Sequence, residues 1–484
     1  MILAIDQGTT GTTCLVFDGE GKIRGRAYSE FRQHFPRPGW VEHDANEIWE
    51  VTKRVASHAL ADAKADPGSL AAIGITNQRE TVVAWDRKTG EPVHNAIVWQ
   101  DRRTASRCEE LRAAGHEQLV RERTGLVLDP YFSGTKIEWL LANVDAARDA
   151  VFGTIDSWLV FKLTGRHATD LTNASRTMLF DIGELRWDAE LCDLLGVDPE
   201  RLPEPLPSAG IFGTTSEFGG EVPVAGIAGD QQAALFGQAC VEPGMAKNTY
   251  GTGSFVLLNA GSQMPEPGAG LLTTIAWGIG DSVSYALEAA VFVTGAAVQW
   301  LRDGLGLVAE AAETEGMAAS LDSNDDVYFV PALTGLGSPH WDPYARGTIV
   351  GLTRGTGRAH LARAALEGIA YQTVDAVRAQ EGLAGKQLSE LRADGGAVAN
   401  RWLMQFQADV LGAPVIVPEI AETTALGAAY LAGIGAGTWT TDEVGAMWGE
   451  AARYEPAMES AERERLLGRW TEAVGRSRGW ARPA

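Results

Sequence analysis

The sequence predicts an α/β fold with a mixed β-sheet, in a chain divided into two halves. Short apolar runs alternate with longer stretches of helical periodicity, which is the pattern of an α/β protein. The first three runs, at residues 2–5, 14–17 and 23–31, are separated by polar turns and are typical of antiparallel strands. A turn rich in Gly and Thr opens each half, at residues 6–11 and 249–253, which suggests an ancient duplication.

Helix and strand signals continue this order through the first half. Asp44 and Glu47 have the spacing of a capping box, and the apolar residues after them fall on one helical face. Residues 71–76 and 95–99 then read as strands. Further on, the chain predicts a strand at 222–227 that leads directly into a helix at 231–239.

The Val-Glu-Pro-Gly segment at 241–244 interrupts this pattern, so we place the boundary between two domains there, as 1–243 and 244–484. The second domain opens with strands around the second Gly/Thr turn and continues with a long helix at 360–378. A helix at 425–432 is rich in Ala and Gly, which allows close packing against a neighbouring element or a nucleotide. An amphipathic surface helix is expected from residue 459 on.

Composition and charge exclude several classes of protein. The 484 residues are 45% hydrophobic, which is ample for a globular core. Acidic residues outnumber basic ones by 63 to 41 with no basic cluster, so we expect no nucleic-acid partner. The most apolar stretch, residues 289–301, is too short for a membrane span of about 20 residues. Four widely spaced Cys residues and the lack of a signal peptide favour a cytoplasmic protein.

The first turn is a candidate phosphate-binding loop. The common nucleotide-binding and hydrolase motifs, including the P-loop and the dinucleotide fingerprint, are absent from the sequence. In their place Asp6 ends a strand, Gly8 allows close backbone approach, and Thr9 and Thr10 offer hydroxyls. A carboxylate facing phosphates requires a hard cation between them, usually Mg²⁺. A plain hairpin turn is the alternative for this loop and for the second turn at 250–253.

Two further segments have both a functional and a structural interpretation. Gly395 and Gly396 follow a predicted strand at 388–393 and could pass close to a base or ribose, or could simply serve a helix cap. Asp230 lies where a strand gives way to a helix. It could be a catalytic carboxylate or only an N-cap residue, and the helix dipole is expected to favour its charged form.

Several segments together resemble the FGGY carbohydrate kinases, the sugar-kinase branch of the actin-like ATPases. One family signature fits residues 347–352 and 360–367, and another fits residues 131–140. Blocks at 38–44, 74–81, 229–237 and 341–347 are similar to the members that act on glycerol. The resemblance extends from residue 2 to about residue 440.

This resemblance implies two actin-like (ribonuclease H-like) ATPase domains with a cleft between them. It implies transfer of the γ-phosphoryl group of ATP to glycerol, with Mg²⁺ required and with closure of the two halves to exclude water. It also implies a homodimer or homotetramer. The alternatives are a kinase for another substrate, such as xylulose, ribulose or gluconate, and a non-catalytic ATP switch of the actin type.

The resemblance assigns roles to particular residues. Asp230 is expected to be the catalytic base, and Asp6 to bind Mg²⁺ directly or through water. Glycerol is expected to contact Arg79, Glu80, Trp99, Tyr131, Asp230, Gln231 and Phe255. Without the resemblance, Arg79 and Glu80 would be interpreted as a surface ion pair or a solvated turn, and Trp99 and Phe255 as core residues. The phosphates and nucleoside of ATP are expected to contact Thr9, Thr10, Gly11, Thr252, Gly295, Gln299, Gly396 and Asn400.

The sequence departs from the family pattern at two places that matter for ligands. Thr13 stands where many members have Arg, which removes a positive charge near the phosphates. Many bacterial members bind the inhibitor fructose 1,6-bisphosphate through a Gly-Gly-Xaa-Arg loop, for which the nearest match here is residues 219–222, with Glu221 and no Arg. We therefore expect no inhibition by that sugar.

Overall fold

The computed structural model describes residues 1–481 and contains a single large mixed sheet of 13 strands. From edge to edge the order is β23-β22-β21-β15-β16-β18-β17-β13-β14-β5-β1-β2-β3. These strands are β1 (Ile2–Gln7), β2 (Gly11–Phe17), β3 (Ile23–Glu30), β5 (Ala72–Asn77), β13 (Ala209–Thr215), β14 (Val222–Gly229), β15 (Met245–Tyr250), β16 (Ser254–Gly261), β17 (Leu272–Ile279), β18 (Ser282–Val291), β21 (Glu390–Gly395), β22 (Val415–Pro418) and β23 (Glu450–Tyr454).

Smaller sheets and the helices complete the fold. The remaining strands are β4 (Glu42–His43), β6 (Val82–Trp85), β7 (Ala96–Ile97), β8 (Val151–Thr154), β9 (Ala168–Asp170), β10 (Phe180–Asp181), β11 (Arg186–Trp187), β12 (Glu204–Leu206), β19 (Tyr328–Val330) and β20 (Thr348–Val350). The helices are α1 (Ala45–Asp62), α2 (Ala105–Ala113), α3 (Glu117–Thr124), α4 (Gly134–Asn143), α5 (Ile155–Thr164), α6 (Leu171–Ala174), α7 (Ala189–Leu194), α8 (Asp230–Gly237), α9 (Gly295–Gln299), α10 (Glu313–Ala319), α11 (Arg358–Ala384), α12 (Arg401–Leu411), α13 (Thr423–Gly435), α14 (Thr441–Met447) and α15 (Ser460–Ser477).

The large sheet contains the same five-stranded pattern twice. In the first half, β3-β2-β1 pair antiparallel, and β1-β5-β14 pair parallel. In the second half, β18-β16-β15 pair antiparallel, and β15-β21-β22 pair parallel. Strands β13 and β17 lie between the two patterns, and they pair with each other at Ala209 and Ile279. The repeat predicted from the two Gly/Thr turns is therefore present in the sheet topology.

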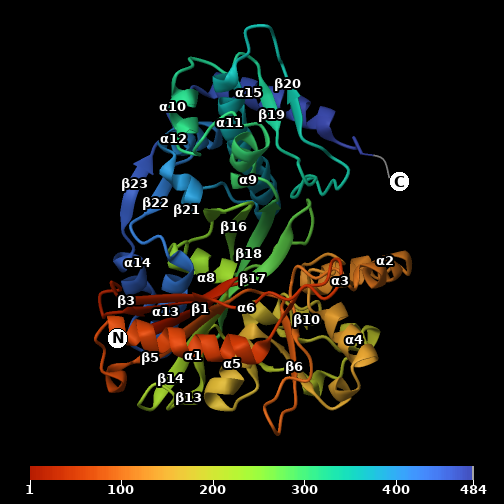
Figure 1. The fold of residues 1–484 in the computed structure, drawn as a ribbon, viewed down its shortest axis with the longest axis vertical. Helices are drawn as coiled ribbons and strands as arrows, with labels where there is room; N and C mark the ends of the chain where they lie inside the picture. Colours follow the sequence, from red (N-terminus) through yellow and green to blue (C-terminus); the bar gives the residue numbers. More distant parts are fainter. Residues whose placement is uncertain (482–484) are drawn as a thin grey trace.

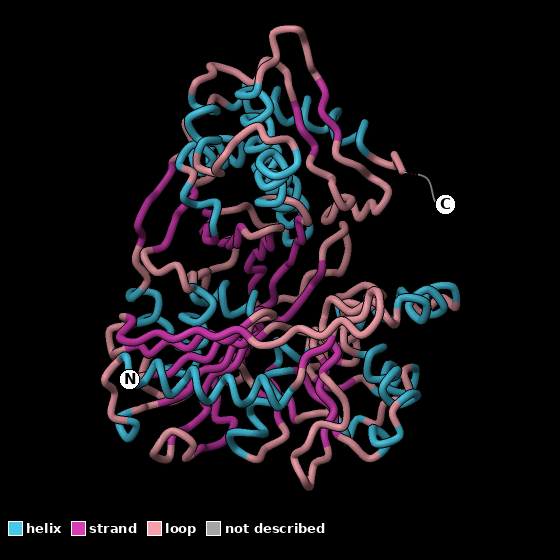
Figure 2. The backbone as a smooth tube through the Cα atoms, viewed as in Figure 1, coloured by secondary structure: helices cyan, strands magenta, loops and turns pink. Residues whose placement is uncertain are grey.

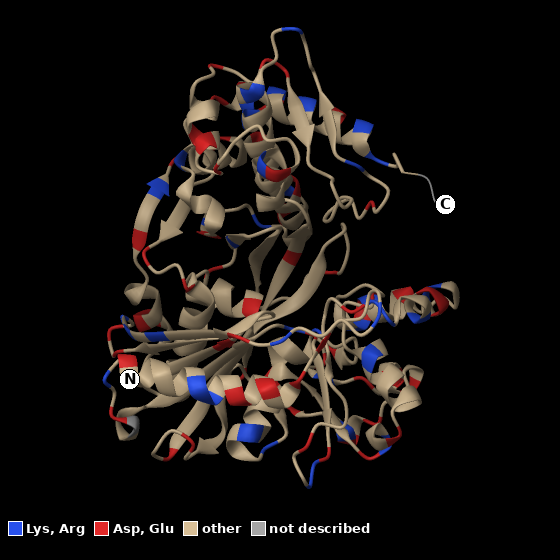
Figure 3. Ribbon diagram, in the orientation of Figure 1, with Lys and Arg blue, Asp and Glu red and all other residues tan. Residues whose placement is uncertain are grey.

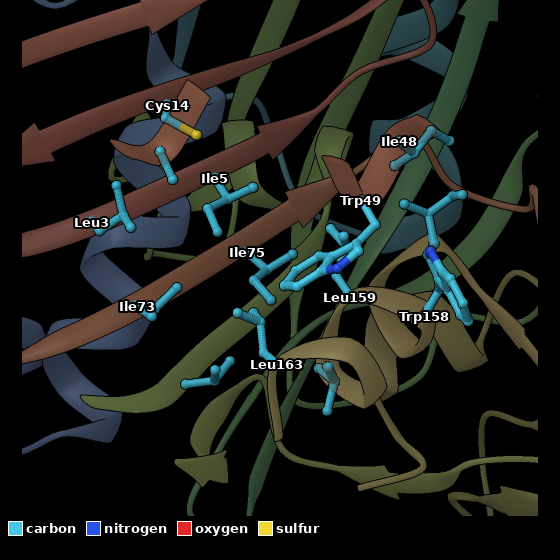
Figure 4. Packing of buried hydrophobic residues seen from close by; sticks show 14 of the residues in the cluster. Leu3, Ile5, Cys14, Ile48, Trp49, Ile73, Ile75, Trp158, Leu159 and Leu163 are labelled. Carbon is cyan, nitrogen blue, oxygen red and sulfur yellow. The ribbon is translucent and has the colours of Figure 1, made fainter. Parts of the chain in front are cut away.

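The first half builds its core between the sheet and α1 and α5. Figure 4 shows Ile73 and Ile75 of β5 on the same side of the sheet as Trp49 of α1 and Leu159 of α5. Asp44 caps α1 as predicted, because its side chain accepts hydrogen bonds from the backbone N–H groups of Asn46 and Glu47. The other half of the predicted capping box is wrong. The Glu47 carboxylate accepts a hydrogen bond from the Arg32 backbone N–H at 3.1 Å, which anchors the chain after β3.

Helix α13, from the second half of the chain, packs against the sheet of the first half. A Cβ added at Gly74 of β5 would lie 2.2 Å from the carbonyl oxygen of Ala428, and one at Gly427 would lie 1.8 Å from that of Ala233 in α8. Glycine therefore permits helix-to-sheet and helix-to-helix contact at backbone distance. Of the two uses predicted for this Ala/Gly-rich helix, packing against a neighbour is the one observed.

Figure 1 shows two lobes along the long axis, with α1, α5 and β6 in one and α10, α12 and β19 in the other, while α13 of the second half lies in the lobe of α1. Helices cover the strands in both lobes (Figure 2), and acidic and basic residues occur in both (Figure 3). Within residues 1–481, no helix is both long and apolar enough to cross a bilayer. The domain division at 243/244 stays a prediction, and residues 482–484 of the second domain lie outside the described residues. The strand predicted at 95–99 is shorter, limited to Ala96–Ile97.

Candidate active site

The turn after β5 places Arg79 and Glu80 inside the molecule. Gln78 fastens this turn to the first Gly/Thr loop, because its backbone N–H donates to the Gln7 carbonyl at 2.8 Å and its side chain to the Gly8 carbonyl at 3.2 Å. Glu80 adopts a φ of 62°, a left-handed conformation that is rare for a residue with a side chain and occurs preferentially at functional sites.

Arg79 and Glu80 belong to a buried cluster of four charged side chains. Each of Arg79, Glu80, Arg176 and Glu288 is at most 1% exposed. Glu288 on β18 accepts from both ends of the Arg79 guanidinium, at 2.5 and 3.2 Å, while Arg176 donates to Glu80 at 2.8 Å and to Glu288 at 3.0 Å. The interpretation of Arg79 and Glu80 as a surface ion pair is therefore wrong.

Asp230 is the first residue of α8 and lies next to this cluster. Its Oδ1 accepts from the Gln231 backbone N–H at 2.7 Å and lies 3.2 Å from Arg79 Nε, and its side chain is 32% exposed. Gly229 is the N-cap, so the interpretation of Asp230 as only a capping residue is wrong. Burial raises the pKa of Asp230, opposed by the positive charges of Arg79 and Lys247. The Gln231 N–H at the helix N-terminus does favour the charged form, as expected, but burial outweighs it.

Lys247 of β15 connects the second half of the chain to Gln231. The Lys247 ammonium donates to the Gln231 side-chain oxygen and, at 3.0 Å, to the Thr249 hydroxyl. Burial lowers the pKa of Lys247 to about 8, and the charges of Asp394 and Asp230 oppose this shift. Gln231 is therefore held in place by a residue of the other half.

An aromatic wall lies beside the charged cluster. Trp99 and Tyr131 meet edge to face with their ring centroids 5.4 Å apart, and the Tyr131 hydroxyl lies 3.5 Å from Arg79 Nη2. The Trp99 indole N–H donates to the Thr9 hydroxyl at 2.9 Å, which ties the wall to the first loop. Phe255 lies two residues before the β16 residue that pairs with Glu288, so both point to the same face of the sheet. The three aromatic residues are partly exposed rather than core residues.

Asp6 lies one residue before the end of β1, within electrostatic reach of Asp230. Burial, with a further contribution from the negative charge of Asp230, raises the pKa of Asp6 to about 7. Thr13 pairs with Asp6 across the sheet, so the position where relatives carry Arg faces this carboxylate. The carboxylate of Asp6 is an oxygen donor of the kind that a hard divalent cation prefers.

The second half contains a cavity of about 410 Å³ that brings together five of the predicted nucleotide-binding residues. Thr252, Gly295, Gln299, Gly396 and Asn400 all line it. A Cβ added at Gly295 would lie 2.6 Å from the Gly251 carbonyl, whereas one added at Gly396 would meet no atom within 4 Å. Gly295 is thus required for packing and Gly396 leaves space in the cavity. Asn400 also caps α12 by accepting from the Leu403 N–H at 2.9 Å.

The remaining predicted nucleotide-binding residues lie elsewhere. Thr9, Thr10 and Gly11 are in the turn beside Trp99 and are not part of the cavity lining. Strand β15 instead connects the cavity to Gln231, since Lys247 contacts Gln231 and the turn after this strand carries Thr252 to the cavity. Within residues 1–481, no group of three or more His, Cys, Asp or Glu side chains could hold a metal ion without help from a ligand.

Arg176, Glu288 and Lys247 were not among the residues predicted for the site. For Glu288 a signal was available, because a single acidic residue interrupts the apolar strand β18. For Lys247 the signal was a lysine inside a strand whose other residues are almost all buried. Arg176 follows the short helix α6 with no pattern that would have distinguished it from a surface arginine.

The chain is similar to known proteins both in its sequence and in its structure. Residues 1–237 match the N-terminal domain of the FGGY family of carbohydrate kinases, and residues 246–436 match its C-terminal domain. "Glycerol kinase 2" of Thermotoga maritima is 56% identical over 490 residues, 99% of each chain. The glycerol kinase of Deinococcus radiodurans is 55% identical over 490 residues, 99% of this chain and 98% of that one.

Solved structures show the same relationship. The crystal structure of Plasmodium falciparum glycerol kinase with ADP matches with a TM-score of 0.95 at 36% identity, covering 98% of both chains. Gluconate kinase from Lactobacillus acidophilus matches with a TM-score of 0.90 at 24% identity, covering 98% of this chain and 97% of that one. At that identity the second match establishes the fold alone.

Proposed function

The chain belongs to the FGGY family of carbohydrate kinases, and on this premise we propose that it transfers the γ-phosphoryl group of ATP to a terminal hydroxyl of glycerol, producing sn-glycerol 3-phosphate and ADP. The observation that carries the proposal is the position of Asp230. Its partly exposed carboxylate accepts from the Gln231 backbone N–H and lies 3.2 Å from Arg79 Nε, and Arg79 in turn adjoins Tyr131 of the aromatic wall. Full-length relatives at 55–56% identity that are named glycerol kinases support the same substrate.

Asp230 is the proposed catalytic base. The transferred group passes through a loose transition state, so the base mainly orients the attacking hydroxyl and accepts its proton as the new bond forms. Burial raises the pKa of Asp230 and makes it a better proton acceptor than an ordinary aspartate. The Gln231 N–H donates to Oδ1, which also lies 3.2 Å from Arg79 Nε, and this leaves the other carboxylate oxygen for the substrate hydroxyl.

The polyol site combines this carboxylate with the aromatic wall. Trp99, Tyr131 and Phe255 would contact the carbon atoms, while Gln231 and Arg79 would supply polar partners for hydroxyls. Arg79 and Glu80 are covered in the structure, whereas Asp230 and Gln231 are partly exposed. The hydroxyls of glycerol therefore meet Asp230 and Gln231 first.

The nucleotide would occupy the cavity of the second half, with its phosphates directed along β15 toward the first loop. Gly396 fits a nucleoside because it leaves open space in the cavity. Gln299 fits because it lies one helical turn from Gly295 on the same wall of the cavity. Asp6 would bind Mg²⁺ together with phosphate oxygens and water. When bound, this ion neutralises charge on the transferring phosphoryl group.

We propose a cytoplasmic location and a homodimer or homotetramer for this protein. The four cysteines, Cys14, Cys108, Cys192 and Cys240, are all buried as free thiols, which fits a reducing compartment. Sedimentation velocity at several protein concentrations measures the oligomeric state. A monomer at all concentrations would contradict the expected assembly.

The function is tested by measuring ADP release with Mg·ATP across a panel of glycerol, xylulose, ribulose and gluconate, with a sample lacking any sugar or polyol. Glycerol should support the highest kcat/KM, and product analysis should find phosphate on a terminal carbon. Preference for a ketose or for gluconate would identify a different carbohydrate kinase. Slow ADP release that does not depend on glycerol would instead identify an ATP switch.

A further inference from the structure

Glu288 connects the proposed polyol site to the second half of the chain. It lies near the middle of β18 in the large sheet, beyond the predicted domain boundary, yet its carboxylate binds two arginines of the first half. The contact to Arg79 is bidentate, with Nη1 to Oε2 at 2.5 Å and Nη2 to Oε1 at 3.2 Å. A bidentate pair fixes the plane of a guanidinium as well as its position.

The cluster is balanced in charge and sealed from water. Arg79, Arg176, Glu80 and Glu288 carry two positive and two negative charges, and none is more than 1% exposed. The two arginines hold the pKa of Glu288 at about 2, so it stays ionised throughout the range in which the enzyme works. The four charges of the cluster neutralise one another without Asp230. Asp230 is thus a fifth charged group beside Arg79, and its side chain is partly exposed to solvent.

Both Nη atoms of Arg79 also have further polar neighbours. Nη1 donates to the Gln232 side-chain oxygen at 3.1 Å, and Nη2 lies near the Tyr131 hydroxyl. With both ends of the guanidinium held by Glu288, its Nε edge faces the Asp230 carboxylate. Arg176 holds Glu80 in a similar way, because its Nε donates to Glu80 Oε1 at 2.8 Å.

Building on the proposed function, we propose that Glu288 and Arg176 are positioning residues that hold Arg79 and Glu80 in the arrangement that binds the polyol. The hydrogen bonds of these two side chains go to Arg79, Glu80 and each other, so both act through the side chains that they hold. Their effect is therefore on the geometry of the polyol site and not on the nucleotide cavity, whose lining includes none of these four residues.

The test compares Glu288→Gln and Arg176→Lys with the parent enzyme in steady-state kinetics, with glycerol and ATP varied separately. Gln keeps the size of the Glu288 side chain but loses its charge, so the paired guanidinium is no longer fixed. We expect KM for glycerol to rise roughly 10- to 100-fold, the range for losing a charged hydrogen bond, while KM for ATP changes less than about twofold. Glu288→Asp, which keeps the charge, should recover part of the loss.

Glu367→Gln is the matched control. Glu367 is also buried and paired with an arginine of the second half, Arg363 at 2.8 Å, but it lies on α11 away from the charged cluster. This variant should change thermal stability with no change in KM for glycerol. An equal effect of Glu367→Gln on KM for glycerol would overturn the proposal, since the effect would then follow any buried charge.

A charge-balanced variant separates geometry from electrostatics. Glu288→Gln combined with Arg176→Gln restores a neutral cluster, so its melting temperature should rise above that of Glu288→Gln alone, while KM for glycerol stays high. Recovery of both quantities would mean that the pair only balances charge, and the positioning role would be rejected. A fall in kcat with unchanged KM for glycerol in all single variants would also reject it. An inactive parent enzyme would instead refute the proposed function.

Discussion

Replacing Asp230 with Asn should remove most of the turnover while the protein remains folded. Asparagine has the same size, and its side-chain oxygen can still accept the Gln231 N–H at 2.7 Å. What is lost is the negative charge that lies 3.2 Å from Arg79 Nε, a charge that burial already disfavours. Losing the attraction to Arg79 destabilises the protein, whereas removing a buried charge stabilises it. Because these effects oppose each other, the free energy of unfolding should change by no more than about 1 kcal/mol. Loss of a general base costs roughly 10²–10⁴ in kcat, equivalent to about 3–5 kcal/mol of activation free energy.

The assay couples ADP release to NADH oxidation at saturating Mg·ATP and glycerol, with thermal unfolding recorded for each variant. Asp188→Asn is the matched control, because Asp188 is another aspartate at a helix N-terminus, where it accepts from the Leu191 N–H at 2.9 Å. This control should keep parental turnover. Turnover above a tenth of the parent value in Asp230→Asn would refute the role of this carboxylate as the base.

Four further predictions concern packing, pH, closure and regulation. Gly427→Ala should lower the free energy of unfolding by about 3 kcal/mol in urea denaturation, because the new Cβ would lie 1.8 Å from the Ala233 carbonyl, while Gly445→Ala, with no atom within 4 Å, should not destabilise. Burial raises the pKa of Asp156 to about 7, so the native state holds a proton that the unfolded chain releases above about pH 4, and stability falls as pH rises toward 7. Between pH 5 and 8 this group should account for a loss of roughly 2–3 kcal/mol, and Asp156→Asn should show a shallower decline. Glycerol together with a non-hydrolysable ATP analogue should reduce the radius of gyration in small-angle X-ray scattering, and an unchanged value would contradict closure of the halves. Fructose 1,6-bisphosphate at millimolar concentration should leave activity unchanged, because Glu221 stands where a basic side chain would bind a phosphate; clear inhibition would refute this interpretation.

Local patterns in the sequence were sufficient for much of the fold. The alternation of apolar runs predicted the antiparallel start at β1 to β3, and the apolar face after Asp44 predicted α1. These features depend on residues close together in the chain, where periodicity and capping are direct physical signals. The strand predicted at 95–99 was too long because an apolar run indicates burial as well as strand pairing, and only Ala96–Ile97 has a partner.

Some residues of the candidate site could be predicted from the sequence, and others could not. Asp6, Asp230 and the two Gly/Thr turns could be singled out because each lies at the end of a strand, where functional residues gather. The burial of Arg79 and Glu80 could not be predicted, since their counter-charges, Arg176 and Glu288, are 96 and 209 residues away in the chain. The direction of the pKa shift of Asp230 was mispredicted for the same reason, because desolvation depends on what covers a group.

The amino-acid sequence by itself determined the alternation of strands and helices, the repeat and the family, because periodicity, turn chemistry and motif spacing act over a few residues. Only the tertiary structure decided which charges meet: β18 brings Glu288 to Arg79, and β15 brings Lys247 to Gln231. The physical reason is that an ion pair depends on distances of a few ångströms in space, and separation along the chain does not limit those distances once the sheet has assembled.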